Sequence, residues 1–249
     1  MNITGNTIFI PGATSGIGLA LAQRLKARGN TVIIGGRRTQ LLDELREQGF
    51  DTVRIDTADP QSITDAAAWV IAEHPELNVL VTMAGVMLPE DWHTPEGFLQ
   101  TAEDTVSVNL LGPIRLIGAF IGQLRSQPGS TIITVSSGLA SVPLARTATY
   151  SATKAAIHSL SEAIRLQLAD TSVQVIELVP PAVRTGLGDT GGNPRAIPLD
   201  GFADDVIGLL ETRPDAHEIL VEQVKFQRYA ERRGEYDAAL ATINGGPRG

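Results

Sequence analysis

The stretch "IFIPGATSGIG", residues 8–18, joins a short apolar run to a longer amphipathic one through a turn with glycines at positions 12, 16 and 18. Glycine has no Cβ, so the backbone can turn sharply there, and a diphosphate can approach the amides that begin the next helix, where the helix dipole favours anions. A tight turn without a ligand would use the same residues. The position directly after a predicted strand favours a phosphate-binding turn.

The rest of the chain repeats this order of strand and helix. Short runs rich in β-branched residues predict strands at 6–10, 31–35, 51–56, 78–83, 130–137, 173–179 and 217–223. Apolar residues at helical spacing predict helices at 16–28, 41–48, 62–73, 103–125 and 148–169. The alternation predicts a single α/β domain over residues 1–249, a doubly wound parallel sheet of about seven strands flanked by helices on both faces.

Composition excludes several classes of protein. The chain has 249 residues, of which 43% are hydrophobic, enough for a sizeable core. A formal net charge of -8 argues against a nucleic-acid partner, because phosphate binding needs a basic face, although a local basic pocket stays open. There is no cysteine, and the histidines, at 74, 93, 158 and 217, are scattered. We therefore expect no disulfide and no metal.

The N-terminus, "MNITGNTIFIPG", has no basic leader, and no apolar run approaches the ~20 residues that span a bilayer. We expect a cytoplasmic protein that does not bind membranes. One long irregular stretch, residues 184–202, is rich in glycine and proline. We expect it to be a short substrate-covering loop, with a surface connector as the alternative.

The second predicted strand ends in "VIIGGRRTQ", residues 32–40. A carboxylate at this strand end would bind the ribose 2′-hydroxyl of NAD, but glycine stands there. Arg37 and Arg38 follow, and a guanidinium fork matches a phosphate, so NADP(H) is expected over NAD(H) unless both arginines are only solvated. Asp56, at the end of the third strand, could accept a hydrogen bond from the adenine amino group or cap the following helix.

An ordered set of motifs resembles the short-chain dehydrogenase/reductase family over nearly the whole chain. The set comprises Gly-x-x-x-Gly-x-Gly at Gly12, Gly16 and Gly18, then Ala84-Gly85, Asn109 in "VNLLG", Ser137 in "VSSG", and Tyr150-x-x-x-Lys154. The resemblance implies a Rossmann-type fold and a homodimer or homotetramer formed through the helices at 103–125 and 148–169.

The resemblance also implies hydride transfer between the C4 of NADP(H) and a small-molecule ketone, aldehyde or secondary alcohol. Tyr150 would be the general acid or base, and Ser137 would hydrogen-bond the substrate oxygen. Lys154 would hold the nicotinamide ribose and lower the Tyr150 pKa, and Asn109 would hold a water connecting Lys154 to solvent. Further cofactor contacts are expected from Ser15, Ile17, Thr57, Ala84, Gly85, Pro180, Val183 and Thr185.

Helical geometry supports the pairing of Tyr150 with Lys154, since residues four apart share one face of a helix. Moving a tyrosine pKa from ~10 to ~7 takes about 4 kcal/mol. A cation at ~4 Å supplies about 1 kcal/mol in bulk water and about 4 kcal/mol at an effective dielectric constant of ~20. Burial of the phenolate raises the Tyr150 pKa instead. The positive charge of the oxidised nicotinamide and a hydrogen bond from Ser137 are therefore expected to help Lys154 to lower it.

Three residues depart from the family pattern: Pro11 where Thr or Ser is usual, Met83 where Asn is usual, and Pro181 where Gly is common. The first two predict a more apolar contact between the glycine turn and the neighbouring strand, and a pocket open to larger or apolar carbonyl compounds is expected. The alternative functions are a non-catalytic NADP(H)-binding sensor or regulator, whose mark would be loss of Tyr150 or Lys154, and an epimerase or dehydratase on the same fold.

Overall fold

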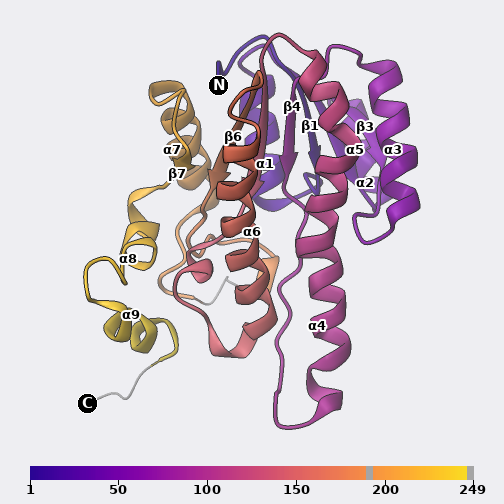
Figure 1. Ribbon diagram of the computed structural model, residues 1–249. Helices are drawn as coiled ribbons and strands as arrows, with labels where there is room; N and C mark the ends of the chain where they lie inside the picture. Colours follow the sequence, from indigo (N-terminus) through magenta and orange to yellow (C-terminus); the bar gives the residue numbers. More distant parts are fainter. Residues whose placement is uncertain (189–192, 246–249) are drawn as a thin grey trace.

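A parallel sheet of seven strands forms the centre of the computed structural model, which describes residues 1–188 and 193–245 (Figure 1). The strand order is β3-β2-β1-β4-β5-β6-β7, which confirms the predicted fold class. The strands are β1 (Thr7–Pro11), β2 (Thr31–Gly36), β3 (Asp51–Arg54), β4 (Val79–Thr82), β5 (Ser130–Val135), β6 (Val173–Leu178) and β7 (Glu218–Ile219).

Helices cover both faces of this sheet because its strands are apolar on both sides. In β1, Ile8 and Ile10 belong to one core cluster and Phe9 to the other, as the two-residue period of a strand requires. One face carries α1 (Gly16–Lys26), α2 (Thr39–Glu47) and α7 (Leu199–Thr212), and the other carries α3 (Pro60–Glu73), α5 (Gly112–Ser126) and α6 (Ala148–Gln167). The remaining helices are α4 (Leu99–Val106), α8 (Lys225–Arg228) and α9 (Tyr236–Ile243).

The strand order reverses at β1, which lies between β2 and β4, and the chain segments that leave β1 and β4 touch there. Gly12 has φ +90°, and a Cβ on it would lie 2.6 Å from the Cα of Ala84. A Cβ on Gly18 would lie 3.0 Å from the Cγ of Met83. The side chain of Met83 therefore makes the apolar contact that its departure from the family pattern predicts.

The long helix predicted at 103–125 begins earlier and is not uniform. It consists of α4, a π-helical turn over Ser107–Leu111, and α5. The irregular segment expected at 184–202 ends sooner, because α7 begins at Leu199, and residues 189–192 of that segment lie outside the described residues. Phe202, Val206 and Leu210 share one face of α7 and pack into the core, a helical pattern hidden behind the glycine- and proline-rich approach.

The helical stretch Pro95–Ser126 contains an 18-residue window with a mean hydropathy of 1.4 and is, by length and composition only, long and apolar enough to cross a membrane. The expectation that no segment reaches this length is therefore wrong. Leu116, Phe120 and Leu124 on this stretch are fully buried in the core cluster beneath β4 and β5. A core helix of this kind meets the same length and composition criteria as a membrane span.

Replacing Gly12 by alanine is expected to lower the free energy of unfolding by at least ~1–3 kcal/mol, because its φ is unfavourable for alanine and the Cβ would collide with Ala84. Gly208, inside α7 with open space around it, is the matched control, and alanine there should raise stability by ~0.5–1 kcal/mol. Urea unfolding measures both. An unchanged midpoint for Gly12→Ala would contradict the close approach.

Candidate active site

A cavity of about 1310 Å³ opens at the carboxyl ends of the strands. It exceeds the roughly 300–1,000 Å³ of a site for one small ligand, so it has room for an extended cofactor and a second molecule. Every residue that the sequence predicts to bind cofactor lies on its wall, as do Ser137, Tyr150 and Lys154. Asn109 does not reach the wall and lies buried behind it.

The cavity wall where β2 ends has space only for a residue without a side chain. A Cβ on Gly36 would lie 2.5 Å from the Cγ2 of Thr14, so no side chain fits at this strand end. The Nη2 of Arg38 donates hydrogen bonds to the Oγ1 of Thr14 at 2.7 Å and the Oγ of Ser15 at 3.0 Å. This fixes one guanidinium at the glycine turn. Thr14 was not predicted as a site residue, although its place between two glycines was a usable signal.

Arg37 and Asp56 form the outer edge of the same region, with 4.0 Å between a guanidinium nitrogen and a carboxylate oxygen. Asp56 does not cap α3. Its carboxylate accepts a hydrogen bond from the backbone N–H of Ala58 at 3.0 Å, whereas Asp59 caps the helix by accepting from the N–H of Gln61. The capping alternative for Asp56 is therefore wrong, and its carboxylate lies on the cavity wall.

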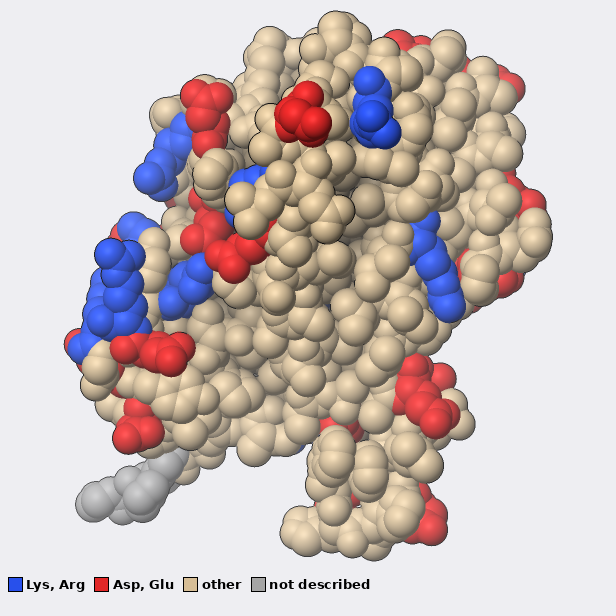
Figure 2. All heavy atoms as spheres, in the orientation of Figure 1, with Lys and Arg blue, Asp and Glu red and all other residues tan. Residues whose placement is uncertain are grey.

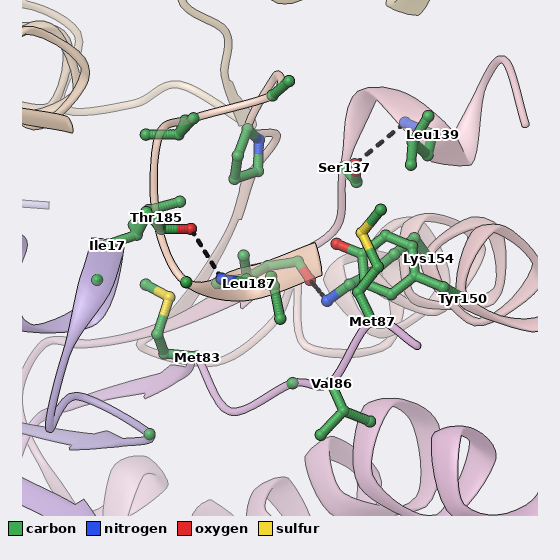
Figure 3. A pocket seen from close by; sticks show the side chains of 18 of the residues that line it. Ile17, Met83, Val86, Met87, Ser137, Leu139, Tyr150, Lys154, Thr185 and Leu187 are labelled. Atoms are coloured by element: carbon green, nitrogen blue, oxygen red, sulfur yellow. Dashed lines mark hydrogen bonds between the residues drawn. The ribbon is translucent and has the colours of Figure 1, made fainter. Parts of the chain in front are cut away.

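Ser137, Tyr150 and Lys154 lie together on one side of the pocket, opposite Ile17 and Thr185 (Figure 3). The first turn of α6 carries Tyr150, and Lys154 follows one turn later, with its Nζ 5.5 Å from the centre of the tyrosine ring. The same Nζ donates to the carbonyl oxygen of Val135 at 2.8 Å. Ser137 follows β5, and its hydroxyl accepts a hydrogen bond from the N–H of Leu139 at 3.1 Å.

Burial governs the ionisation of this pair. Loss of solvent raises the pKa of Tyr150 to about 12, with hydrogen bonding to Ser137 acting in the opposite direction. Loss of solvent also lowers the pKa of Lys154 to about 8. The net shift of the Tyr150 pKa in this structure is therefore upward, opposite to the lowering expected from Lys154, because desolvation of the phenolate is the largest cause. The phenol keeps its proton at neutral pH.

Asn109 lies in the π-helical turn, fully buried, and binds the main chain of Val86 twice. Its Oδ1 accepts the N–H of Val86 at 2.9 Å and its Nδ2 donates to the carbonyl oxygen at 2.8 Å. A Cβ on Gly85 would lie 3.4 Å from this Oδ1 and 3.8 Å from the Nζ of Lys154, so both side chains approach Gly85. Local π-helical turns often mark functional positions.

The start of α6 depends on a residue that the sequence did not single out. The helix has no side-chain cap of its own at Thr147. Glu90 replaces it from a distant segment: its Oε2 accepts the N–H of Thr149 at 3.1 Å, and its own N–H donates to the carbonyl oxygen of Arg146 at 2.9 Å. No local pattern could reveal a contact across 59 residues. The helix that carries Tyr150 is thus held by the segment after β4.

A buried polar network supports the other side of the site. Ser136, next to Ser137, donates to Glu177, which is 1% exposed, and the second carboxylate oxygen of Glu177 lies 2.7 Å from the Nδ1 of His158. Glu218 completes a cluster with His158 and Glu177 that resembles a metal-ligand set in spacing. Arg228, 2.7 Å from Glu218 and 3.4 Å from His158, already supplies the cation for this cluster.

The sequence model of a family described as short chain dehydrogenase matches residues 6–193. Uncharacterized oxidoreductase DltE of Bacillus subtilis (strain 168) is 38% identical over 98% of this chain and 98% of its own length. The crystal structure of a short chain dehydrogenase from Burkholderia cenocepacia J2315 in complex with NADP has a TM-score of 0.81 at 28% identity, over 96% of this chain and 99% of that chain.

An alcohol dehydrogenase from the archaeon Thermococcus sibiricus, complexed with 5-hydroxy-NADP, has a TM-score of 0.76 at 25% identity, over 87% of this chain and 95% of that chain. The matched sequence, residues 6–193, holds the glycine turn, Ser137, Tyr150 and Lys154. On these grounds the chain belongs to the short-chain dehydrogenase family of oxidoreductases.

Proposed function

We propose that the protein is an NADP(H)-dependent oxidoreductase that interconverts a ketone or aldehyde with the corresponding alcohol. The observation that carries this proposal is the gathering of Ser137, Tyr150 and Lys154 on the wall of a cavity whose other end holds a fixed guanidinium. Solved relatives that hold NADP or 5-hydroxy-NADP support the choice of cofactor.

The residues at the glycine turn fit a dinucleotide diphosphate and a ribose phosphate. The missing Cβ at Gly12 lets the strand exits pack together, and the N-terminus of α1 offers its amides to an anion. Arg38, held by Thr14 and Ser15, presents a planar donor fork beside Gly36, where no carboxylate side chain has room. The cofactor, when bound, gives or takes the hydride.

Tyr150 supplies the proton in reduction. With a pKa of about 12 the phenol is protonated at neutral pH, and its hydrogen bond with Ser137 places that hydroxyl where the substrate oxygen would bind. As the proton leaves, the charge that forms on the phenol oxygen is stabilised by the ammonium of Lys154, which acts strongly because both side chains are nearly buried. Asn109, beside Lys154, is the candidate for a water-mediated proton path.

Two further proposals concern assembly and location. Leu99 in α4, Leu111 in the π-helical turn and Ile114 in α5 expose apolar side chains, which supports a homodimer or homotetramer formed through the helices expected at 103–125 and 148–169. Cytoplasmic localisation stays a proposal from the sequence. A non-catalytic NADP(H) sensor is disfavoured because Tyr150 and Lys154 are both present and both buried.

Tyr150→Phe is expected to lower kcat for NADPH-dependent reduction of a ketone by roughly 10²–10⁴-fold, the usual contribution of a positioned general acid. Binding of NADPH should be unchanged. Turnover is measured by the loss of nicotinamide absorbance, and NADPH binding is measured by fluorescence titration. Tyr229→Phe, away from the cavity wall, is the matched control. Wild-type turnover by Tyr150→Phe would refute the role of the phenol.

Arg38→Gln is expected to reduce the preference for NADPH over NADH, measured as the ratio of the two kcat/KM values, by about 10-fold to 100-fold. The reason is the loss of charge-assisted hydrogen bonds worth ~1.5–3 kcal/mol. Arg46→Gln on α2, whose guanidinium pairs with Asp43, is the control. An unaltered cofactor preference in Arg38→Gln would exclude this arginine from the ribose phosphate.

The pH profile of kcat/KM for reduction should fall as pH rises through the Lys154 pKa of about 8. Lys154 loses its charge there, while Tyr150, with its pKa of about 12, keeps its proton. One such ionisation gives a decline of about tenfold per pH unit in a parameter that reports on the free enzyme.

Lys154→Arg tests the assignment, because arginine stays charged throughout this range. Any activity that this variant retains should show no decline near pH 8. A wild-type profile that stays level well past this pH would contradict the assignment.

A further inference from the structure

We infer that the outer part of the cavity binds the carboxylate of an oxo acid, with Arg146 and Arg195 as its binding residues. This inference rests on the proposed function, which it extends by naming a substrate class: an apolar ketone or aldehyde that carries a carboxylate away from the reacting carbonyl.

The charge of the cavity wall is opposite to that of the chain. The sequence has 28 acidic and 20 basic residues, and acidic groups are spread over the face shown in Figure 2, including the projecting end of α4. Yet the described residues that line the cavity include one carboxylate, that of Asp56, and five cationic side chains, those of Arg37, Arg38, Arg146, Lys154 and Arg195. A cleft lined by one sign of charge concentrates ligands of the other sign.

Three of these cations already have a place in the proposed reaction. Arg37 and Arg38 follow β2, near one edge of the sheet, and Lys154 adjoins Tyr150. Arg195 lies in the segment between β6 and β7, at the opposite edge. Binding of a cofactor at the glycine turn and proton transfer at Tyr150 therefore give no role to Arg146 and Arg195.

The main chain of Arg146 and the guanidinium of Arg195 are each held by a hydrogen bond that involves no carboxylate. Arg146 lies one turn before Tyr150, and its carbonyl oxygen accepts the N–H of Glu90 at 2.9 Å. The Nη1 of Arg195 donates to the carbonyl oxygen of Thr242 in α9. Among residues 1–188 and 193–245, neither guanidinium is within ion-pair distance of a carboxylate, unlike Arg24, Arg28, Arg46 and Arg228.

The same cavity wall that holds Tyr150 and these arginines also offers apolar side chains. They are those of Met87, Leu139, Leu144, Phe226 and Ile243. The C-terminal part of this wall is fixed by Asn244, whose Oδ1 accepts the N–H of Ala145 at 2.7 Å and whose Nδ2 donates to the carbonyl oxygen of Pro143 at 3.0 Å.

A substrate that satisfies all three zones has its carbonyl at Tyr150, an apolar middle, and an anion at the mouth. Methionine and leucine side chains adapt to varied apolar shapes, whereas a planar guanidinium fork matches a carboxylate in particular. The class is therefore set by the anion more than by the body of the substrate.

The test compares two ketones with the same body, 4-benzoylbutyrate and its methyl ester, reduced with NADPH. Wild type should prefer the acid in kcat/KM by about tenfold or more, and Arg146→Gln and Arg195→Gln should each lower kcat/KM for the acid by about 10-fold to 100-fold. The loss should appear in KM, with kcat and reduction of the ester unchanged, because the contact is the same in ground and transition states. Arg232→Gln, on the exposed surface away from the cavity, is the control.

Equal reduction of acid and ester by wild type, or equal losses for both in the variants, would overturn the inference. A second measurement separates its failure from that of the proposed function: the shift in Tm caused by 4-benzoylbutyrate in the presence of NADP⁺. A shift in wild type that is lost in the double variant, without turnover of any ketone, would keep the carboxylate site and refute the reductase. No shift in wild type would overturn the carboxylate site.

Discussion

The contact between two strand exits, Gly12 after β1 and Ala84 after β4, is the constraint on which the rest of the site depends. The backbones meet so closely that a single Cβ would separate them. The next residue along from Ala84 is Gly85, which adjoins both Asn109 and Lys154. Displacing the contact would therefore move the glycine turn and the part of the cavity wall around Lys154 together.

Much of this architecture could be predicted from the sequence because its determinants are local. Short runs of β-branched residues identified the strands, and helical spacing placed Tyr150 beside Lys154. Helix α7 was missed because glycine and proline precede it and masked its apolar face. The π-helical turn was missed as well, since a single extra residue in a helix leaves no periodic trace over so short a length.

The direction of the Tyr150 pKa shift could not be predicted from the sequence. An effective dielectric constant suited to the protein surface gave Lys154 enough influence to acidify the phenol. Both side chains are instead buried, so desolvation raises the pKa of Tyr150 and lowers that of Lys154. The depth of a side chain is a property of the whole fold, and neither spacing nor composition contains it.

Buried polar groups support the elements that carry Ser137, Tyr150 and Lys154. Glu177 would be costly inside the protein without partners, but Ser136 and His158 satisfy both of its oxygens. This carboxylate links β5, β6 and α6 beneath Ser137, Tyr150 and Lys154. A hydrophobic replacement of the same shape would fill the space without fixing the relative position of these three elements.

The cap that Glu90 places on α6 has a consequence for how enzymes of this kind diverge or are redesigned. The segment after β4 forms part of the pocket wall, so it is a natural target for exchange when a different substrate is wanted. Here the same segment caps the start of the helix that carries Tyr150. Replacing this loop by another would change the pocket wall and remove the cap of α6 together, unless the new loop keeps a carboxylate at position 90.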